Sequence, residues 1–235
     1  MIISGLQKMT LLDYPGRVAC TVFLQGCNFR CPFCHNSGLL GISQDDTIAV
    51  ETLLDFLRKR IGILDGVCIT GGEPTLQNDL PQILRQIKQM GYYIKLDTNG
   101  SRPDMLKALV EEKLIDYVAM DIKNSPDRYG ETIGLSQLPK EIEKSMVFLM
   151  EGELDYEFRT TVVEEFHSEA DILALGQWLS QLSPDRKAKR LFLQPYADRD
   201  SVLVSGLHTP SAEKLSCFKE ILTPYAEFVE IRGAD

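Results

Sequence analysis

Apolar residues along the chain recur with two different periods, one typical of β-strands and one typical of helices. Runs rich in β-branched and aromatic residues predict strands at 18–24, 64–70, 92–98, 117–122, 156–163, 190–196 and 227–232. Between these runs, apolar residues recur every three or four positions, as on the buried face of an amphipathic helix. These helical stripes occupy residues 53–61, 80–90, 105–110, 142–150, 172–182 and 215–222, and Thr209 followed by Pro210 predicts the start of the last helix.

Six strand–helix units in succession predict a parallel sheet covered by helices. With 235 residues and only six full units, the chain favours part of a barrel over a closed eight-stranded one. We therefore expect an α/β fold, a partial (β/α)6 TIM-type barrel with parallel strands. The chain contains no Gly/Ser linker, sequence repeat or low-complexity segment, so residues 1–235 are expected to form a single domain.

Composition and charge narrow the class of protein. The chain is 44% apolar and 25% charged, with a net charge of −9, which argues against a nucleic-acid-binding protein. No apolar run approaches the length of a membrane span, and the first residues do not resemble a signal peptide. We therefore expect a cytoplasmic protein with no nucleic-acid or membrane partner.

Short polar motifs follow the predicted strands. GGEP (71–74) follows the second strand, DTNG (97–100) ends the third, and DIK (121–123) ends the fourth. The carboxyl ends of parallel strands meet at one edge, so these motifs are expected to share a site. Each motif alone could be a turn or a simple ion pair, but together they favour binding. Glu73 would accept hydrogen bonds from an ammonium group, and Lys123 would contact a carboxylate.

The segment GCNFRCPFCHN (26–36) carries three cysteines, Cys27, Cys31 and Cys34. Zinc would need His35 as fourth ligand, directly beside Cys34, whereas zinc ligands usually have at least two residues between them. A thiol–disulfide site at Cys31 and Cys34 would leave Cys27 unused. A [4Fe–4S] cluster with three thiolates and one open iron fits the ligand number, and the open iron would accept a molecule with an amino and a carboxylate group. The remaining cysteines, which are scattered in apolar surroundings, are expected to be buried: Cys20, Cys68 and Cys217.

These motifs together resemble the radical S-adenosylmethionine superfamily. The likeness extends from DYPG (13–16) to QPY (194–196) and includes the cysteine spacing, Phe33 before the last cysteine, and GGEP. FLQGCNFRCPFCHN, LDTNG and DIK are similar to the motifs of glycyl-radical-enzyme activases. Among these, the motifs most resemble the activators of anaerobic ribonucleoside-triphosphate reductase, followed by those of pyruvate formate-lyase. The resemblance implies that the chain is one radical SAM domain.

The resemblance also implies roles for individual residues. A [4Fe–4S] cluster would be held by Cys27, Cys31 and Cys34. Bound S-adenosylmethionine would contact Phe33 through its adenine and would contact Gly71, Gly72 and Glu73 through its methionyl amino group. Asp121 and Lys123 match a segment that helps to hold this cofactor, and Asp97 and Asp121 match carboxylates that line a monovalent-cation site. Activators of pyruvate formate-lyase have a histidine where this chain has Ala197, so that ribose contact is not carried over.

The activity implied by the resemblance is radical chemistry. A one-electron donor such as flavodoxin or ferredoxin would reduce the cluster, and reductive cleavage of S-adenosylmethionine would give a 5′-deoxyadenosyl radical. This radical would take the Cα hydrogen of a glycine in a glycyl-radical partner enzyme, with Asp13 positioning that glycine. The resemblance implies that this partner is anaerobic ribonucleoside-triphosphate reductase. The alternative is a radical SAM enzyme for a small molecule. No acid–base pair is required, so His167 and His208 are expected at the surface, and His35 is expected to order the cysteine loop.

Overall fold

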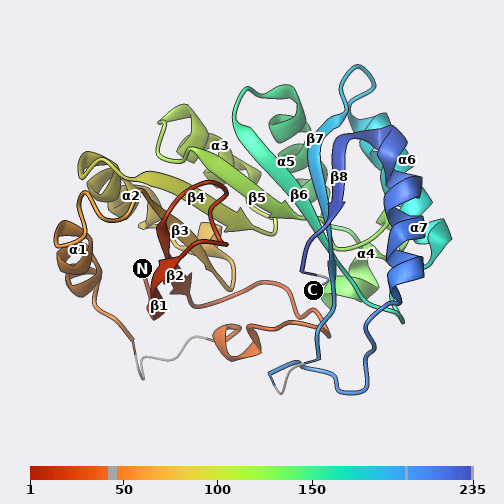
Figure 1. The fold of residues 1–235 in the computed structure, drawn as a ribbon, viewed down its shortest axis with the longest axis horizontal. Helices are drawn as coiled ribbons and strands as arrows, with labels where there is room; N and C mark the ends of the chain where they lie inside the picture. The colour runs from red at the N-terminus through yellow and green to blue at the C-terminus, as the bar shows by residue number, and fades with distance from the viewer. Residues whose placement is uncertain (42–46, 199–200, 234–235) are drawn as a thin grey trace. The chain divides into compact units, whose positions relative to one another are not determined.

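The computed structural model describes residues 1–41, 47–198 and 201–233, and strands alternate with helices along them (Figure 1). The strands are β1 (Ile3–Thr10), β2 (Ala19–Leu24), β3 (Gly66–Gly71), β4 (Tyr93–Thr98), β5 (Tyr117–Asp121), β6 (Asp155–Val162), β7 (Ala188–Pro195) and β8 (Ala226–Ile231). The α-helices are α1 (Val50–Arg58), α2 (Leu80–Gln89), α3 (Pro103–Glu111), α4 (Pro126–Ile133), α5 (Lys140–Glu151), α6 (Glu169–Leu182) and α7 (Ala212–Leu222). Short 3-10 helices are Ser37–Leu39, Pro74–Leu76 and Thr223–Tyr225.

The strands follow one another in the sheet in chain order, from β1 to β8. Parallel pairing joins β2 to β3, β3 to β4, β6 to β7 and β7 to β8. Each strand from β2 to β7 is followed by a helix before the next strand begins. The predicted α/β fold with six β/α units is therefore confirmed.

Strand β1 contradicts the prediction that all strands are parallel. It pairs antiparallel with β2, and only residues 11–18 connect the two strands. So short a connection has no room for the crossover that a parallel pair needs, whereas an antiparallel pair can be joined by a hairpin. Strand β1 has no clear apolar pattern, because its middle contains Gly5 and the exposed residues 7–9.

The chain divides into two compact units. Unit 1 contains Met1–Asn28, Gly38–Thr98 and Asp104–Ala119, and unit 2 contains Phe29–Ser37, Asn99–Pro103 and Met120–Asp235. Strands β1 to β4 belong to unit 1 and strands β6 to β8 to unit 2. The single-domain expectation stays a prediction.

In unit 1, the predicted helical stripes mostly face the core. Helix α1 buries Leu53, Leu54 and Leu57, and it lies beside α2 (Figure 1). Ile61 was expected on the same stripe, but it is 56% exposed. The reason is that α1 ends at Arg58, so Ile61 no longer follows the helical period.

In unit 2, helices α6 and α7 pack side by side (Figure 1). Helix α7 begins at Ala212, and the Ser211 side chain accepts a hydrogen bond from the Lys214 backbone N–H. The predicted start at Thr209 and Pro210 is therefore wrong. The Thr209 hydroxyl instead donates to the Tyr196 carbonyl at 2.6 Å, and a serine two residues later is an equally suitable N-cap.

Candidate cofactor site

The residues predicted to form the site are divided between the two units. Unit 1 contains Asp13, Cys27, Gly71, Gly72, Glu73 and Asp97, and unit 2 contains Cys31, Phe33, Cys34, Asp121 and Lys123. Apart from Asp13, which lies between β1 and β2, each belongs to the carboxyl end of a strand or to the segment after it. Their placement at strand ends therefore agrees with the sequence prediction.

Gly71 and Gly72 lie where β3 passes close to the backbone that follows β2. A Cβ atom on Gly71 would be 2.2 Å from the Leu24 carbonyl oxygen, and one on Gly72 would be 2.2 Å from the Gly26 carbonyl oxygen. The Gly72 N–H donates to Leu24 at 2.8 Å, and the Glu73 N–H donates to Gly26 at 2.7 Å. Both glycines are required by this close backbone contact, which fixes GGEP against the start of the cysteine loop.

The Glu73 side chain is fully buried in unit 1. Its Oε1 accepts hydrogen bonds from the Thr75 backbone N–H at 3.1 Å and from the Thr75 hydroxyl at 2.5 Å. The Thr98 hydroxyl donates to the same oxygen at 2.8 Å. Glu73 therefore caps the short helix Pro74–Leu76, as the turn interpretation expects, and these three donors also hold its carboxylate in one orientation. The sequence prediction missed both threonines.

Asp97 is paired with a buried lysine that the sequence prediction missed. Lys95 is 2% exposed, and its Nζ donates to Asp97 Oδ1 at 2.5 Å. The same Nζ lies 3.9 Å from the Cys68 sulfur on the adjacent strand. A charged residue in the middle of the apolar strand β4 was the available sequence signal, because an unpaired ammonium is too costly to bury.

Asp13 is held to the same sheet by a side-chain hydrogen bond. The Thr21 hydroxyl on β2 donates to Asp13 Oδ2 at 2.5 Å. Thr21 is in register with Cys68, and Cys68 is in register with Lys95. Residues in register on neighbouring strands face the same side of the sheet. The Asp13 carboxylate and the Lys95–Asp97 pair therefore belong to one polar row on one face of unit 1.

In unit 2, the cysteine loop is fixed by backbone and aromatic contacts. The Cys34 N–H donates to the Cys31 carbonyl at 3.0 Å. The His35 ring stacks on Tyr196 with 5.7 Å between centroids, and its Nε2 lies 2.8 Å from the Ala197 carbonyl oxygen. Because a carbonyl only accepts hydrogen bonds, Nε2–H is the donor. His35 therefore orders the cysteine loop, as predicted.

The three clustered cysteines supply soft sulfur donors. All are free thiols; Cys31 is buried, and Cys27 and Cys34 are half-buried. Within the described residues, no group of three or more His, Cys, Asp or Glu side chains forms a preformed metal site. Three thiolates in C-x3-C-x2-C spacing are nevertheless the donor set that an iron–sulfur cluster takes, so the residues fit the group by their chemistry. Their role as ligands stays a prediction.

The scattered cysteines are buried in two of three cases. Cys20 and Cys68 are fully buried, as predicted, and burial raises the pKa of the Cys20 thiol to about 12. Cys217 on α7 is only half-buried, so the prediction is wrong for this residue. It lies between exposed Ser216 and buried Phe218 on α7, outside the predicted apolar stripe.

Asp121 in unit 2 binds two cations. Its Oδ1 accepts from Arg159 Nε and its Oδ2 from Lys123 Nζ, each at 2.9 Å. Burial alone would raise the pKa of Asp121, but the Arg159 and Lys123 charges lower it to about 2. Burial alone would lower the pKa of Lys123, but the charges of Asp121 and Cys31 raise it. Both groups are therefore charged at neutral pH. Arg159 was missed, although a charged residue inside β6 was again a signal.

Phe33 and His167 belong to buried parts of unit 2. Phe33 is 4% exposed, and its ring lies 5.8 Å from the Phe166 ring. The prediction that both remaining histidines lie at the surface holds for His208, whose side chain is 73% exposed. It is wrong for His167, which is 1% exposed, because hydrogen bonds satisfy both of its ring nitrogens inside the unit.

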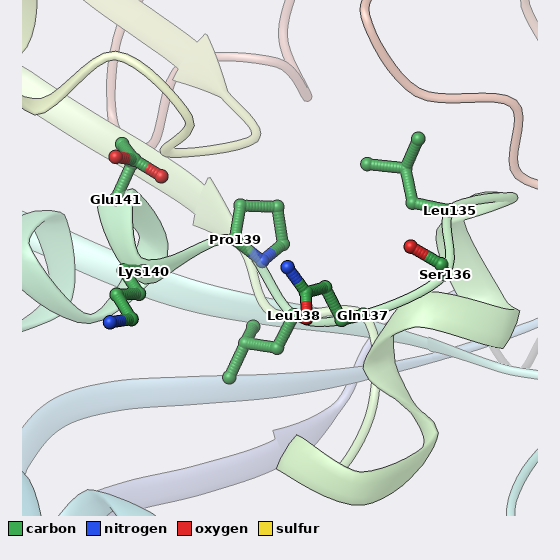
Figure 2. A pocket seen from close by; sticks show the side chains of 7 residues that line it. All are labelled: Leu135, Ser136, Gln137, Leu138, Pro139, Lys140 and Glu141. Carbon is green, nitrogen blue, oxygen red and sulfur yellow. The ribbon is translucent and has the colours of Figure 1, made fainter.

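A separate hollow lies between the end of α4 and the start of α5. Figure 2 shows the side chains that line it, which belong to residues 135–141. None of the predicted site residues is among them.

Among the helices in the described residues, none is both long enough and apolar enough to cross a membrane.

Comparison with known proteins agrees with these features. Residues 21–166 match the model of the radical SAM superfamily. The chain is 35% identical over 179 residues to a Methanocaldococcus jannaschii protein named as a glycyl-radical enzyme activating enzyme, covering 73% of this chain and 72% of that protein. It is 33% identical over 130 residues to the pyruvate formate-lyase-activating enzyme of Clostridium pasteurianum, covering 53% of each. A solved domain of the pyruvate-formate lyase-activating enzyme from Bacteroides vulgatus has a TM-score of 0.56 at 25% identity, covering 69% of this chain and 98% of that one.

The α/β fold, the cysteine loop and the GGEP turn define an enzyme of the class that combines an iron–sulfur cluster with a small cofactor. The chain belongs to the radical SAM superfamily. Its cofactors are accordingly a [4Fe–4S] cluster and S-adenosylmethionine.

Proposed function

We propose that this protein activates a glycyl-radical enzyme by removing a hydrogen atom from the Cα of one of its glycines. The observation that carries this proposal is the 35% identity over 179 residues to the Methanocaldococcus jannaschii protein named as a glycyl-radical enzyme activating enzyme. The cluster and S-adenosylmethionine together supply the 5′-deoxyadenosyl radical that accepts the hydrogen atom. The protein supplies binding and orientation.

The cluster ligands in this proposal are Cys27, Cys31 and Cys34. The contacts of His35 with Tyr196 and Ala197 support this role, because they hold the residue next to Cys34 in place. The charge of Cys31 is one of the causes that raise the pKa of Lys123, so a cation of the protein lies near one of the proposed ligands.

The proposed contacts with S-adenosylmethionine come from residues at the ends of strands. In unit 1, Gly71 and Gly72 place Glu73, whose carboxylate accepts the methionyl ammonium. In unit 2, the ammonium of Lys123 contacts the methionyl carboxylate, with Asp121 beside it, and Phe33 lies against the adenine. The orientation of Glu73 by its two threonine partners supports its role, since a carboxylate that is already oriented loses less entropy on binding.

Asp13 positions the partner's glycine in this proposal. Its carboxylate is anchored by Thr21, and the backbone N–H groups of Leu12 and Asp13 both donate to the Thr10 hydroxyl at 3.2 Å. A carboxylate held in this way is suited to accept a hydrogen bond from a backbone N–H of an extended peptide. A displacement of about 1 Å at such a position can cost about 100-fold in rate.

The partner proposed for the protein is anaerobic ribonucleoside-triphosphate reductase, and flavodoxin or ferredoxin is the proposed electron donor, in the cytoplasm. A monovalent cation at Asp97 and Asp121 also remains a prediction. Each of these carboxylates already has a cation of the protein as partner: Lys95 for Asp97, and Arg159 and Lys123 for Asp121.

The experiment is anaerobic incubation of the reconstituted protein with S-adenosylmethionine, a one-electron reductant and the reductase. We expect a glycine-centred radical by electron paramagnetic resonance, together with 5′-deoxyadenosine. Pyruvate formate-lyase serves as a second candidate partner in a parallel sample. A radical on pyruvate formate-lyase alone would replace the proposed partner, and the absence of any glycyl radical with either enzyme would contradict the proposed activity.

A further inference from the structure

His167 is a buried histidine with a partner on each side of its ring. Val163 N–H lies 3.1 Å from Nδ1, and the Lys123 carbonyl oxygen lies 2.9 Å from Nε2. These contacts join the loop after β6 to the residue whose ammonium pairs with Asp121. Lys123 and His167 are 44 residues apart in the chain, so this bond depends on tertiary structure.

The partners determine the tautomer of His167. A carbonyl oxygen only accepts, so Nε2 carries a hydrogen and donates to Lys123. Burial lowers the pKa of His167 below its ordinary value. The ring is therefore neutral near pH 7, and Nδ1 accepts from the Val163 N–H. Neutral His167 thus accepts a hydrogen bond from one backbone group and donates one to another.

Two further contacts come from the same loop. The Phe166 carbonyl accepts a hydrogen bond from Asn124 Nδ2 at 2.8 Å, and the Phe166 ring packs against Phe33. The loop of residues 163–167 therefore touches two of the proposed cofactor residues, through the backbone of Lys123 and the ring of Phe33, and it also binds the side chain of Asn124 next to Lys123. Packing and hydrogen bonds of this kind reduce the freedom of the groups that they hold.

We propose that His167 is a positioning residue for the binding of S-adenosylmethionine. Its Nε2–H fixes the backbone of Lys123, and Lys123 contacts the cofactor. This inference depends on the proposed contact between the Lys123 ammonium and the cofactor's carboxylate. Lysine has a flexible four-carbon side chain, so its ammonium is held in place only when the backbone and the charge partner are both fixed. Asp121 fixes the ammonium and His167 fixes the backbone.

The test compares variants of the cluster-containing protein. His167→Phe fills the space without either hydrogen bond, and His167→Gln keeps an N–H donor and an oxygen acceptor. His208→Phe is the matched control, because it makes the same substitution at an exposed histidine. Lys123→Met and the double variant His167→Phe/Lys123→Met complete the set. Affinity for S-adenosylmethionine is measured by calorimetry, and iron content and melting temperature are measured on the same samples.

We expect His167→Phe to bind S-adenosylmethionine about 10-fold more weakly, the change that corresponds to one net hydrogen bond. His167→Gln should recover most of this affinity, and His208→Phe should match the wild type. The double variant should bind no more weakly than Lys123→Met alone, because His167 acts through Lys123.

The possible failures are distinguishable. If Lys123→Met leaves the affinity unchanged, the proposed cofactor contact of Lys123 is wrong. If Lys123→Met weakens binding but His167→Phe and His167→Gln only lower the melting temperature, His167 is purely structural and the inference is wrong. Additive losses in the double variant would also overturn it, because they would mean that His167 acts independently of Lys123. If His167→Phe does not fold, His167→Leu, which also removes both hydrogen bonds, and its double variant with Lys123→Met decide the same question.

Discussion

Arg159 and Asp121 are joined by a hydrogen bond of 2.9 Å between Nε and Oδ1, although 38 residues separate them in the chain. Lys123 takes the other carboxylate oxygen at the same distance. One carboxylate therefore has two cationic partners, which leaves a net positive charge at this point of unit 2. Such a charge suits an anionic group of a ligand, and the bonds to Asp121 fix the orientation of the two cationic side chains.

The first prediction concerns the pH dependence of this ion pair. The pKa of Asp121 is lowered to about 2 in the folded protein, from 3.8. The stabilisation is therefore complete above about pH 4 and is lost as the pH falls through about 2, and it amounts to about 2 kcal/mol. The free energies of unfolding of the wild type and Asp121→Asn should differ by about this amount at pH 6 and converge below about pH 2. A difference that does not change with pH would contradict it.

The second prediction concerns the cluster. Replacing Cys27, Cys31 or Cys34 by serine should abolish the visible absorption of the [4Fe–4S] cluster and lower the iron content from about four per chain. Serine replacements of Cys20, Cys68 and Cys217 are the matched controls and should leave the iron content unchanged. Full iron incorporation in any variant of the first group would remove that cysteine from the ligand set.

The third prediction concerns Glu73. Glu73→Gln keeps an oxygen that can accept from Thr75 and Thr98, so the turn and the cluster should be preserved. The variant loses a charge-assisted hydrogen bond to the cofactor's ammonium, worth roughly 1.5–3 kcal/mol, so its affinity for S-adenosylmethionine should fall about 10- to 100-fold. Calorimetry measures this affinity, and Glu51→Gln on α1 is the control for loss of an exposed carboxylate. An unchanged affinity would restrict Glu73 to its role in the turn.

The fourth prediction concerns Asp13. Asp13→Ala should retain the cluster and still form 5′-deoxyadenosine without coupling, but it should lose most glycyl-radical formation, by about 100-fold. Thr21→Val removes the hydroxyl that anchors Asp13 and should give a smaller loss of the same kind. With deuterium on the partner's glycine, the label should appear in 5′-deoxyadenosine. Label transfer from a small metabolite instead would favour a small-molecule substrate.

The fifth prediction concerns the buried pair of Lys95 and Asp97. Lys95→Met leaves the Asp97 carboxylate without this ammonium and should lower the free energy of unfolding by about 3–5 kcal/mol. The double variant Lys95→Met/Asp97→Asn removes both charges and should recover most of the loss. Urea unfolding measures both values. If the double variant is no more stable than Lys95→Met, the loss arises from packing and not from the unpaired charge.

The sequence by itself determined the local features of this protein. Apolar periodicity predicted the strands from β2 onward and six helices, because the buried face of each element consists mainly of apolar residues. The cysteine spacing, GGEP and DIK each lie within a few residues, so their chemistry was readable without a structure. Antiparallel strand β1 and the short helix α4 were missed, because neither has a clear apolar period.

Tertiary structure decided which distant residues are partners. Thr98 binds Glu73, Arg159 binds Asp121, and His167 binds the Lys123 backbone. These partners are 25, 38 and 44 residues apart in the chain, so no local motif identifies them. Sequence indicated only that a charge inside an apolar strand needs a partner, without identifying it. The prediction that His167 lies at the surface was wrong for the same reason. A histidine in a polar loop is buried only when the fold brings acceptors and donors to both ring nitrogens.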